Sequence, residues 1–138
     1  MAEPVIHEGG CLCGRVRWRA TGAPFSVELC HCAMCRRATG GVLVAWAGFK
    51  ASRFRRTRGE PVYYQSSSEV RRGFCGACGS SLTYESEDDP GEVYVAVGSF
   101  DQPDALAPDR HIFWADRLRW LELADALPRD PGFMTEPR

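Results

Sequence analysis

The sequence predicts an all-β protein, built as a sandwich or a barrel-like stack of sheets. Three observations predict it: turn-forming residues recur at short intervals, the runs between them are short, and several runs alternate between apolar and polar side chains. The chain has 138 residues, which suits one domain with its own core. The turns are expected at residues 9–10, 22, 40–41, 59–61, 76–79 and 89–91.

The first clear strand covers residues 15–20, where Val16, Trp18 and Ala20 alternate with arginines and should face the core. Residues 25–29 also alternate, and the apolar run at 42–46 suits a more deeply buried strand. Further strand candidates are residues 62–64, 70–74, 82–85 and 92–97. Either a short helix over 118–127 or one or two strands over 114–123 would follow. We expect one domain over residues 5–125 and a loose, proline-containing tail over residues 126–138.

Charge and hydropathy narrow the function classes. The net charge is −1, with a basic N-terminal part and an acidic C-terminal part. Arg53, Arg55, Arg56 and Arg58 are interpreted as a solvated loop in a slightly acidic chain, so we expect no nucleic-acid partner. The longest apolar run, about residues 42–49, is far too short to span a membrane, and residues 1–10 lack signal-peptide features. We therefore expect a cytoplasmic protein with reduced cysteines and no membrane partner.

The seven cysteines carry the strongest functional signal. They form three clusters: Cys11-x-Cys13, Cys30-x-Cys32-x-x-Cys35 and Cys75-x-x-Cys78. An odd count does not suit a disulfide framework, whereas thiols two or three residues apart can converge on one metal ion. Structural zinc takes four protein ligands, so the simplest division of seven thiols is four plus three.

This division predicts two zinc ions per chain. One would be structural, closed by Cys11, Cys13, Cys75 and Cys78. The other would be held by Cys30, Cys32 and Cys35 with one coordination position open, which is the pattern of catalytic zinc.

Other interpretations of the cysteines remain open at this point. Cys75-x-x-Cys78 would be a redox dithiol if a βαβ pattern surrounded it, and the sequence shows none. The second site would be a closed structural zinc if His7, His31 or His111 completed it, although a strand-like segment would turn His31 away from the metal. Iron–sulfur ligation lacks its ferredoxin spacing, and the zinc deaminase motifs are missing.

The same segments resemble the glutathione-dependent formaldehyde-activating enzymes and their centromere protein V relatives. The matching segments are residues 9–14, 30–37, 40 and 74–80, with weaker blocks at 95–100 and 108–112. All seven cysteines match in order and spacing, and the resemblance covers roughly residues 5–125. It implies an Mss4-like fold of stacked antiparallel sheets with zinc-binding hairpins, and the same division of the cysteines.

The named activity of that family is the condensation of formaldehyde with glutathione to S-hydroxymethylglutathione, a carbon–sulfur lyase reaction. The resemblance thus implies a zinc enzyme acting on a thiol–aldehyde adduct, with a small thiol such as glutathione as its partner. Arg36 and Arg37 directly follow the second cluster and are candidates to hold a substrate carboxylate. The alternative is a non-catalytic scaffold or interaction module with two structural zinc ions.

Overall fold

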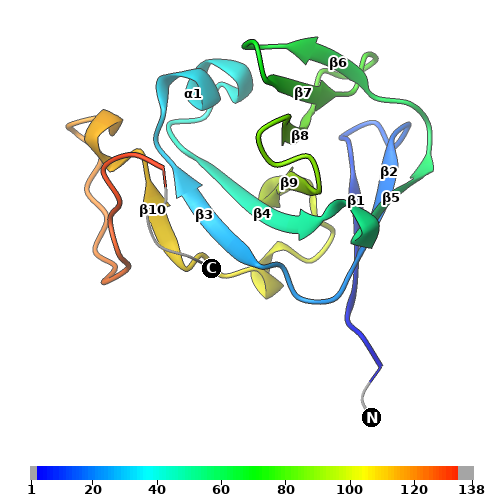
Figure 1. Ribbon diagram of the computed structural model, residues 1–138, viewed down its shortest axis with the longest axis horizontal. Helices are drawn as coiled ribbons and strands as arrows, with labels where there is room; N and C mark the ends of the chain where they lie inside the picture. Colours follow the sequence, from blue (N-terminus) through cyan, green and yellow to red (C-terminus); the bar gives the residue numbers. More distant parts are fainter. Residues whose placement is uncertain (1–2, 134–138) are drawn as a thin grey trace.

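The computed structural model describes residues 3–133 and confirms an all-β architecture of stacked sheets (Figure 1). In this range the strands are β1 (Ile6–Gly10), β2 (Arg17–Thr21), β3 (Ser26–Cys30), β4 (Val44–Lys50), β5 (Phe54–Arg58), β6 (Val62–Gln65), β7 (Val70–Phe74), β8 (Ser81–Ser86), β9 (Glu92–Ala96) and β10 (Arg110–Ile112). The helical elements are α1 (Ala33–Thr39) and the short 3₁₀ turns η1 (Ala51–Arg53), η2 (Val97–Ser99), η3 (Pro103–Ala105) and η4 (Trp114–Asp116).

The strands form two sheets. β1, β2 and β5 make a small antiparallel sheet, and the larger sheet has the order β10-β3-β4-β9-β8-β7-β6. Every pair in the larger sheet is antiparallel except β10 and β3, which are parallel. The main core draws buried side chains from both sheets: Trp18 and Ala20 of β2, Val27 of β3, Ala47 and Phe49 of β4, and Val93 and Val95 of β9.

Strand β4 shows why a continuous apolar run lies at the centre of the larger sheet. Ala47 and Phe49 belong to the main core, whereas Trp46 packs in a second cluster with Cys30 and Cys35 beneath α1. Because both faces of this strand are covered, it has few positions for polar side chains. A buried strand was predicted at residues 42–46, and the structure has one that begins at Val44 and continues to Lys50, with Val42 exposed before it.

Alternation along β2 is also confirmed, but its neighbour β5 was not expected. Trp18 is buried, and the Phe54 ring of β5 packs against it with ring centroids 5.7 Å apart. Most of the run predicted as a solvated loop is thus a strand, paired antiparallel with β2 and exposing its arginines. With one apolar side chain in five, its sequence carries little strand signal, and the free edge of β2 supplies the missing backbone partner.

The C-terminal segment differs from both alternatives predicted for it. Residues 114–127 contain η4, a turn at 119–120 and then chain without regular secondary structure, in place of the helix over 118–127 or the strands over 114–123. Backbone hydrogen bonds then tie the segment to β10: the His111 N–H donates to Pro128 O (2.8 Å) and the Phe113 N–H to Gly132 O (2.7 Å). Of the expected loose tail, residues 126–133 therefore lie beside β10, as Figure 1 shows, and residues 134–138 lie outside the described range.

Within residues 3–133 no helix is both long enough and apolar enough to cross a membrane.

Candidate metal centre and adjoining cavity

The first group of sulfurs, here called the four-sulfur cluster, joins the two sheets. Cys11 and Cys13 follow β1 of the small sheet, and Cys75 and Cys78 lie between β7 and β8 of the large one. All four Sγ atoms lie within 4.8 Å of one another. The structure therefore brings together the two pairs that the spacing assigned to one site, although 62 residues separate Cys13 from Cys75.

Both pairs sit in similar tight hairpins. Cys11 and Cys75 each accept, through their carbonyl oxygens, an N–H from a glycine of positive φ: Gly14 (3.2 Å) and Gly79 (2.8 Å), both at φ 79°. Glycine adopts this conformation without the steric cost that a side chain adds. The hydroxyl and backbone N–H of Ser80, together with smaller contributions, lower the pKa of Cys78 to about 5, which favours the metal-binding thiolate.

The second group, the three-sulfur cluster, lies where β3 passes into α1. Cys30 ends β3, Cys32 is the N-cap of α1, and Cys35 lies in the first turn of the helix. The Cys35 N–H donates to Sγ of Cys32 (3.3 Å), and the Sγ atoms of Cys30 and Cys35 are 3.6 Å apart. Among residues 3–133, no histidine, aspartate, glutamate or further cysteine brings a fourth ligand atom into this group.

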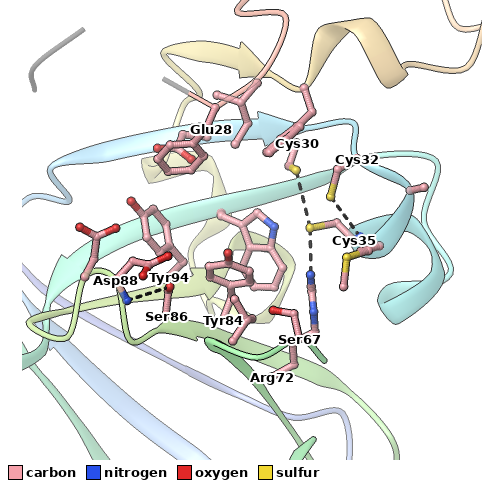
Figure 2. Close-up of a pocket in the computed structure, with 18 of the residues that line it drawn as sticks. Glu28, Cys30, Cys32, Cys35, Ser67, Arg72, Tyr84, Ser86, Asp88 and Tyr94 are labelled. Atoms are coloured by element: carbon pink, nitrogen blue, oxygen red, sulfur yellow. Dashed lines mark hydrogen bonds between the residues drawn. The ribbon is translucent and has the colours of Figure 1, made fainter. Parts of the chain in front are cut away.

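Arg72 of β7 adds a positive charge to the three-sulfur cluster. It is 7% exposed, its Nη1 donates to Sγ of Cys35 (3.5 Å), and its Nε donates to Ser66 Oγ (3.1 Å). Figure 2 shows the guanidinium directed at Cys35. The sequence analysis missed this residue, although alternation along β7 carried a signal: Arg72 shares the buried face with Val70, whereas Arg71 is exposed.

The three sulfurs are unequal in charge. Hydrogen bonds from the Cys30 and Cys32 thiols, and then the Arg72 guanidinium, hold the pKa of Cys35 far below its ordinary value. The contacts with Cys32 and Cys35 instead raise the pKa of Cys30. A buried thiolate at Cys35 is therefore favoured before any cation binds, and a metal ion would take the place of the shared protons.

The sulfur separations fit a tetrahedral metal ion. With metal–sulfur bonds of about 2.3 Å, ideal tetrahedral geometry places neighbouring sulfurs about 3.8 Å apart. The measured separations are 3.6 Å for Cys11–Cys13 and 3.8 Å for Cys13–Cys75 in the four-sulfur cluster, and 3.6 Å for Cys30–Cys35 in the other. Both groups could therefore hold a metal ion, the first with four protein ligands and the second with three.

A cavity of about 510 Å³ opens beside the three-sulfur cluster. Its walls include the aromatic side chains of Trp46, Tyr84, Tyr94 and Phe113. In Figure 2 the cysteines and Arg72 lie toward one side, and Glu28 and Asp88 lie toward the other. The cavity is large enough for a small organic molecule, and such a molecule would contact the sulfurs at one end.

The expected substrate contacts, Arg36 and Arg37, lie just outside this cavity. Arg36 Nη1 donates to the backbone carbonyl oxygens of His31 and Asp116 (2.8 Å to the latter), so it holds α1 against η4. The Arg37 side chain is exposed. Neither residue is among those that line the cavity.

His31 does not face the sulfurs but ends a buried chain of hydrogen bonds. Its Nε2 lies 2.9 Å from Nδ1 of His111, whose Nε2 lies 3.0 Å from both carboxylate oxygens of Asp125. An ionised Asp125 can only accept, so His111 donates from Nε2 and accepts from His31. Burial, and then the nearby His111 and arginines, lower the pKa of His31 to about 4, which keeps the ring neutral. This chain links the turn between Cys30 and Cys32 to the C-terminal segment.

An Asp125→Ala substitution should destabilise the protein. It would leave the buried Nε2–H of His111 without its acceptor, at a cost of about 1–3 kcal/mol. Urea unfolding at neutral pH measures this change, and Asp125→Asn should cost less because its amide keeps one acceptor oxygen. The exposed Asp104→Asn is the charge-matched control and should have almost no effect. Equal stability of Asp125→Ala and the parent protein would show that the hydrogen bonds from His31 through His111 to Asp125 contribute nothing to the stability of the fold.

Stability should also depend on pH through Asp125. The pKa of Asp125 lies below its ordinary value. Partial burial acts to raise this pKa, but the hydrogen bond from His111 and smaller contributions lower it by more. A carboxyl with a lowered pKa in the folded state stabilises the fold above its unfolded pKa, and this contribution is lost as the pH falls through the folded value. The stability difference between the parent protein and Asp125→Asn should therefore shrink in acid.

Comparisons with known proteins match most of this chain. The family model described as glutathione-dependent formaldehyde-activating enzyme matches residues 6–116. A relative from Halomonas elongata, named "Putative glutathione-dependent formaldehyde-activating enzyme", is 26% identical over 128 residues, covering 86% of this chain and 82% of that protein. A crystal structure of a Rhodobacter sphaeroides protein matches with a TM-score of 0.58 and 26% identity, covering 68% of this chain and 87% of that one. Both sulfur clusters lie inside the matched residues, whereas Asp125 lies beyond them.

Proposed function

The chain belongs to the family of glutathione-dependent formaldehyde-activating enzymes, and we propose that it is a zinc enzyme of the carbon–sulfur lyase type. Its reaction would join a small thiol, such as glutathione, to an aldehyde, or cleave the resulting adduct. One observation carries the proposal: three converging sulfurs, with no fourth ligand atom from residues 3–133, lie beside a cavity of about 510 Å³. The name of the Halomonas elongata relative supports the same reaction class.

Zinc is the proposed metal in both clusters because thiolate ligands and tetrahedral sulfur spacing suit it. Cys11, Cys13, Cys75 and Cys78 would hold a structural ion, and Cys30, Cys32 and Cys35 the ion at the reaction site. At the second position, zinc supplies Lewis acidity and one exchangeable site for a substrate sulfur or oxygen atom. The seven cysteines form no disulfide with one another, which also favours a reducing compartment, and we propose the cytoplasm.

The residues around the second site would affect its charge and its contact with water. Three thiolates give a zinc centre a formal charge of −1, and Arg72 offsets that charge from 3.5 Å away at Cys35. The aromatic walls would limit the access of water to a bound adduct. Condensation forms one carbon–sulfur bond, and the proton lost by the thiol is balanced by the proton gained at the former carbonyl oxygen. That Arg36 and Arg37 bind a substrate carboxylate remains a prediction, on which this proposal does not depend.

A screen of small thiols with aldehydes should find a pair that the zinc-loaded protein converts faster than buffer does. Adduct formation can be followed by ¹³C NMR with labelled formaldehyde, and exchange spectroscopy separates catalysis from the spontaneous reaction. Protein stripped of the second zinc is the control and should not accelerate exchange. If the loaded protein binds no thiol and accelerates no exchange, the second zinc is structural and the protein is a scaffold.

A further inference from the structure

The proposed reaction needs a hydrogen-bond donor for the aldehyde oxygen. Addition of a thiol to a carbonyl carbon moves an electron pair onto that oxygen, and a donor already in place stabilises the developing charge. Arg72 lies in the cavity lining, but its guanidinium already donates to Sγ of Cys35 and to Ser66 Oγ. We therefore expect the donor elsewhere in the cavity wall.

Tyr84 of β8 has an unused hydroxyl in that wall. The residue lines the cavity, and no residue in the range 3–133 forms a hydrogen bond with its hydroxyl. The Tyr94 hydroxyl, by contrast, donates to Oε2 of Glu92 (3.3 Å). Nε1 of Trp46 also lacks a partner, but this atom is sealed off from solvent, whereas the Tyr84 oxygen is not. Tyr84 thus offers a donor that a bound molecule can reach.

Packing in strand β8 holds this ring in place. The Tyr84 ring centroid lies 6.0 Å from that of Trp46 and 6.0 Å from that of Tyr94, which meets it edge to face. The Ser67 hydroxyl also borders the cavity, but it belongs to the turn between β6 and β7. A donor held in a packed strand needs less rearrangement than one in a turn, and a phenol is a stronger acid than an aliphatic alcohol.

Tyr84 also lies close to the three-sulfur cluster. Its ring packs against the buried group of side chains that contains Cys30 and Cys35. The Arg72 guanidinium is 5.1 Å from the ring centroid and donates to Sγ of Cys35, so one side chain interacts with both. Figure 2 shows Tyr84 in the cavity between the cysteines and Asp88. A molecule whose sulfur joins the cluster would therefore place its reacting carbon and oxygen beside this phenol.

From this arrangement we propose that Tyr84 is a catalytic residue whose phenol donates its proton to the substrate oxygen. The inference rests on the proposed function, since it takes a thiol and an aldehyde as the reactants. In condensation the carbon–sulfur bond forms, the carbonyl π electrons move to oxygen, and this oxygen takes the proton of Tyr84. The proton released by the thiol restores the phenol, and cleavage of the adduct reverses each step.

A Tyr84→Phe variant tests the role of the hydroxyl. It keeps the ring and its packing, so the zinc content and the thermal melt should match those of the parent protein. The kcat for thiol–aldehyde exchange should fall by about 100-fold, with little change in the KM for the thiol. Parental kcat would overturn the proposal. So would loss of the second zinc ion together with the rate, because the hydroxyl would then act on the metal site.

Two further variants make the same chemical change elsewhere. Tyr64→Phe removes an exposed hydroxyl of β6 and should keep the parental rate. Tyr94→Phe removes a hydroxyl from the same cavity wall that already donates to Glu92, and its effect on kcat should be roughly tenfold smaller than that of Tyr84→Phe. Equal losses from Tyr84→Phe and Tyr94→Phe would show that the rate depends on the polarity of the cavity rather than on one donor, and the proposal would fail.

Binding of thioacetate and ethanethiol tests the same contact without any reaction. Thioacetate carries an oxygen and a sulfur on one carbon, as the adduct does, and ethanethiol has the same skeleton without the oxygen. Isothermal titration into the zinc-loaded protein should show that the preference for thioacetate over ethanethiol falls roughly three- to tenfold in Tyr84→Phe.

This titration separates the inference from the proposed function. If the preference falls in Tyr84→Phe but no thiol and aldehyde turn over, the contact with the substrate oxygen is supported and the lyase reaction is contradicted. If the parent protein turns over and the preference is unchanged in Tyr84→Phe, the lyase reaction is supported and the role of Tyr84 is overturned.

Discussion

With zinc in both clusters as proposed, a Cys75→Ser variant should lose one of the two ions and unfold at a far lower temperature than the parent protein. Cys75 is 2% exposed and belongs to the four-sulfur cluster, which joins the hairpin after β7 to the end of β1. Structural zinc in small domains contributes roughly 10–16 kcal/mol of binding free energy to folding. A whole domain is stable by only about 5–15 kcal/mol, so loss of this site should leave little net stability.

Zinc per chain by mass spectrometry and thermal melts by circular dichroism measure the two effects. The matched control is Cys32→Ser, which makes the same chemical change in the three-sulfur cluster. Cys75→Ser protein that retains two zinc ions and a parent-like melt would contradict a structural role for the four-sulfur cluster. So would equal unfolding of both variants, because the structure places Cys32 outside the contacts that join the sheets.

Local patterns predicted the parts of the fold where burial follows directly from the residue types. In β2 the alternation of Trp18 and Ala20 with arginines is enough to set the inward face, and in β4 the apolar run requires cover on both faces. The cysteine spacing likewise predicted which sulfurs come together, because two tetrahedral sites restrict how seven thiols can be divided.

Elements that depend on distant partners could not be predicted in this way. β5 has one partly buried side chain, Phe54, and is a strand because β2 offers it an edge. Three-residue β10 pairs in parallel with β3, and the C-terminal segment lies along it through backbone groups that any sequence possesses. Helix α1 has Cys32 as its N-cap and Gly40 at its C-terminal end. The sequence predicted a turn at residues 40–41 but no helix before it, because Cys32 was interpreted only as part of a metal motif.

The candidate site shows the same limit. Arg72 contacts Cys35 across 37 positions in the sequence, and His31 contacts His111 across 80. The spacing of residues along one sequence does not reveal contacts between such distant positions. The sequence therefore indicated only the adjacent Arg36 and Arg37 as cations near the cluster. The cavity lining is a product of topology too, because β3, the turn after β8 and η4 each contribute residues to it.

The largest effect on activity should come from Cys32→Ser, with little change in the fold. Serine is among the preferred N-cap residues, so it can accept the Cys35 N–H in place of the sulfur and keep α1 intact. It is a poor zinc ligand, however, and only two thiolates would remain beside the cavity. Because loss of even an indirect contact to a metal ligand often costs 10–100-fold in activity, loss of a ligand should lower kcat/KM by more than about 100-fold.

The decisive comparison is between activity and folding in the same sample. Cys32→Ser should hold one zinc ion per chain, melt close to the parent protein, and no longer accelerate thiol–aldehyde exchange. Cys75→Ser should lose activity only together with its fold, so refolded or low-temperature samples should recover part of it. If Cys32→Ser keeps parental turnover with one zinc ion, the reaction does not occur at the three-sulfur cluster. The cavity beside it would then need another role, since its sulfurs and Arg72 would take no part in the chemistry.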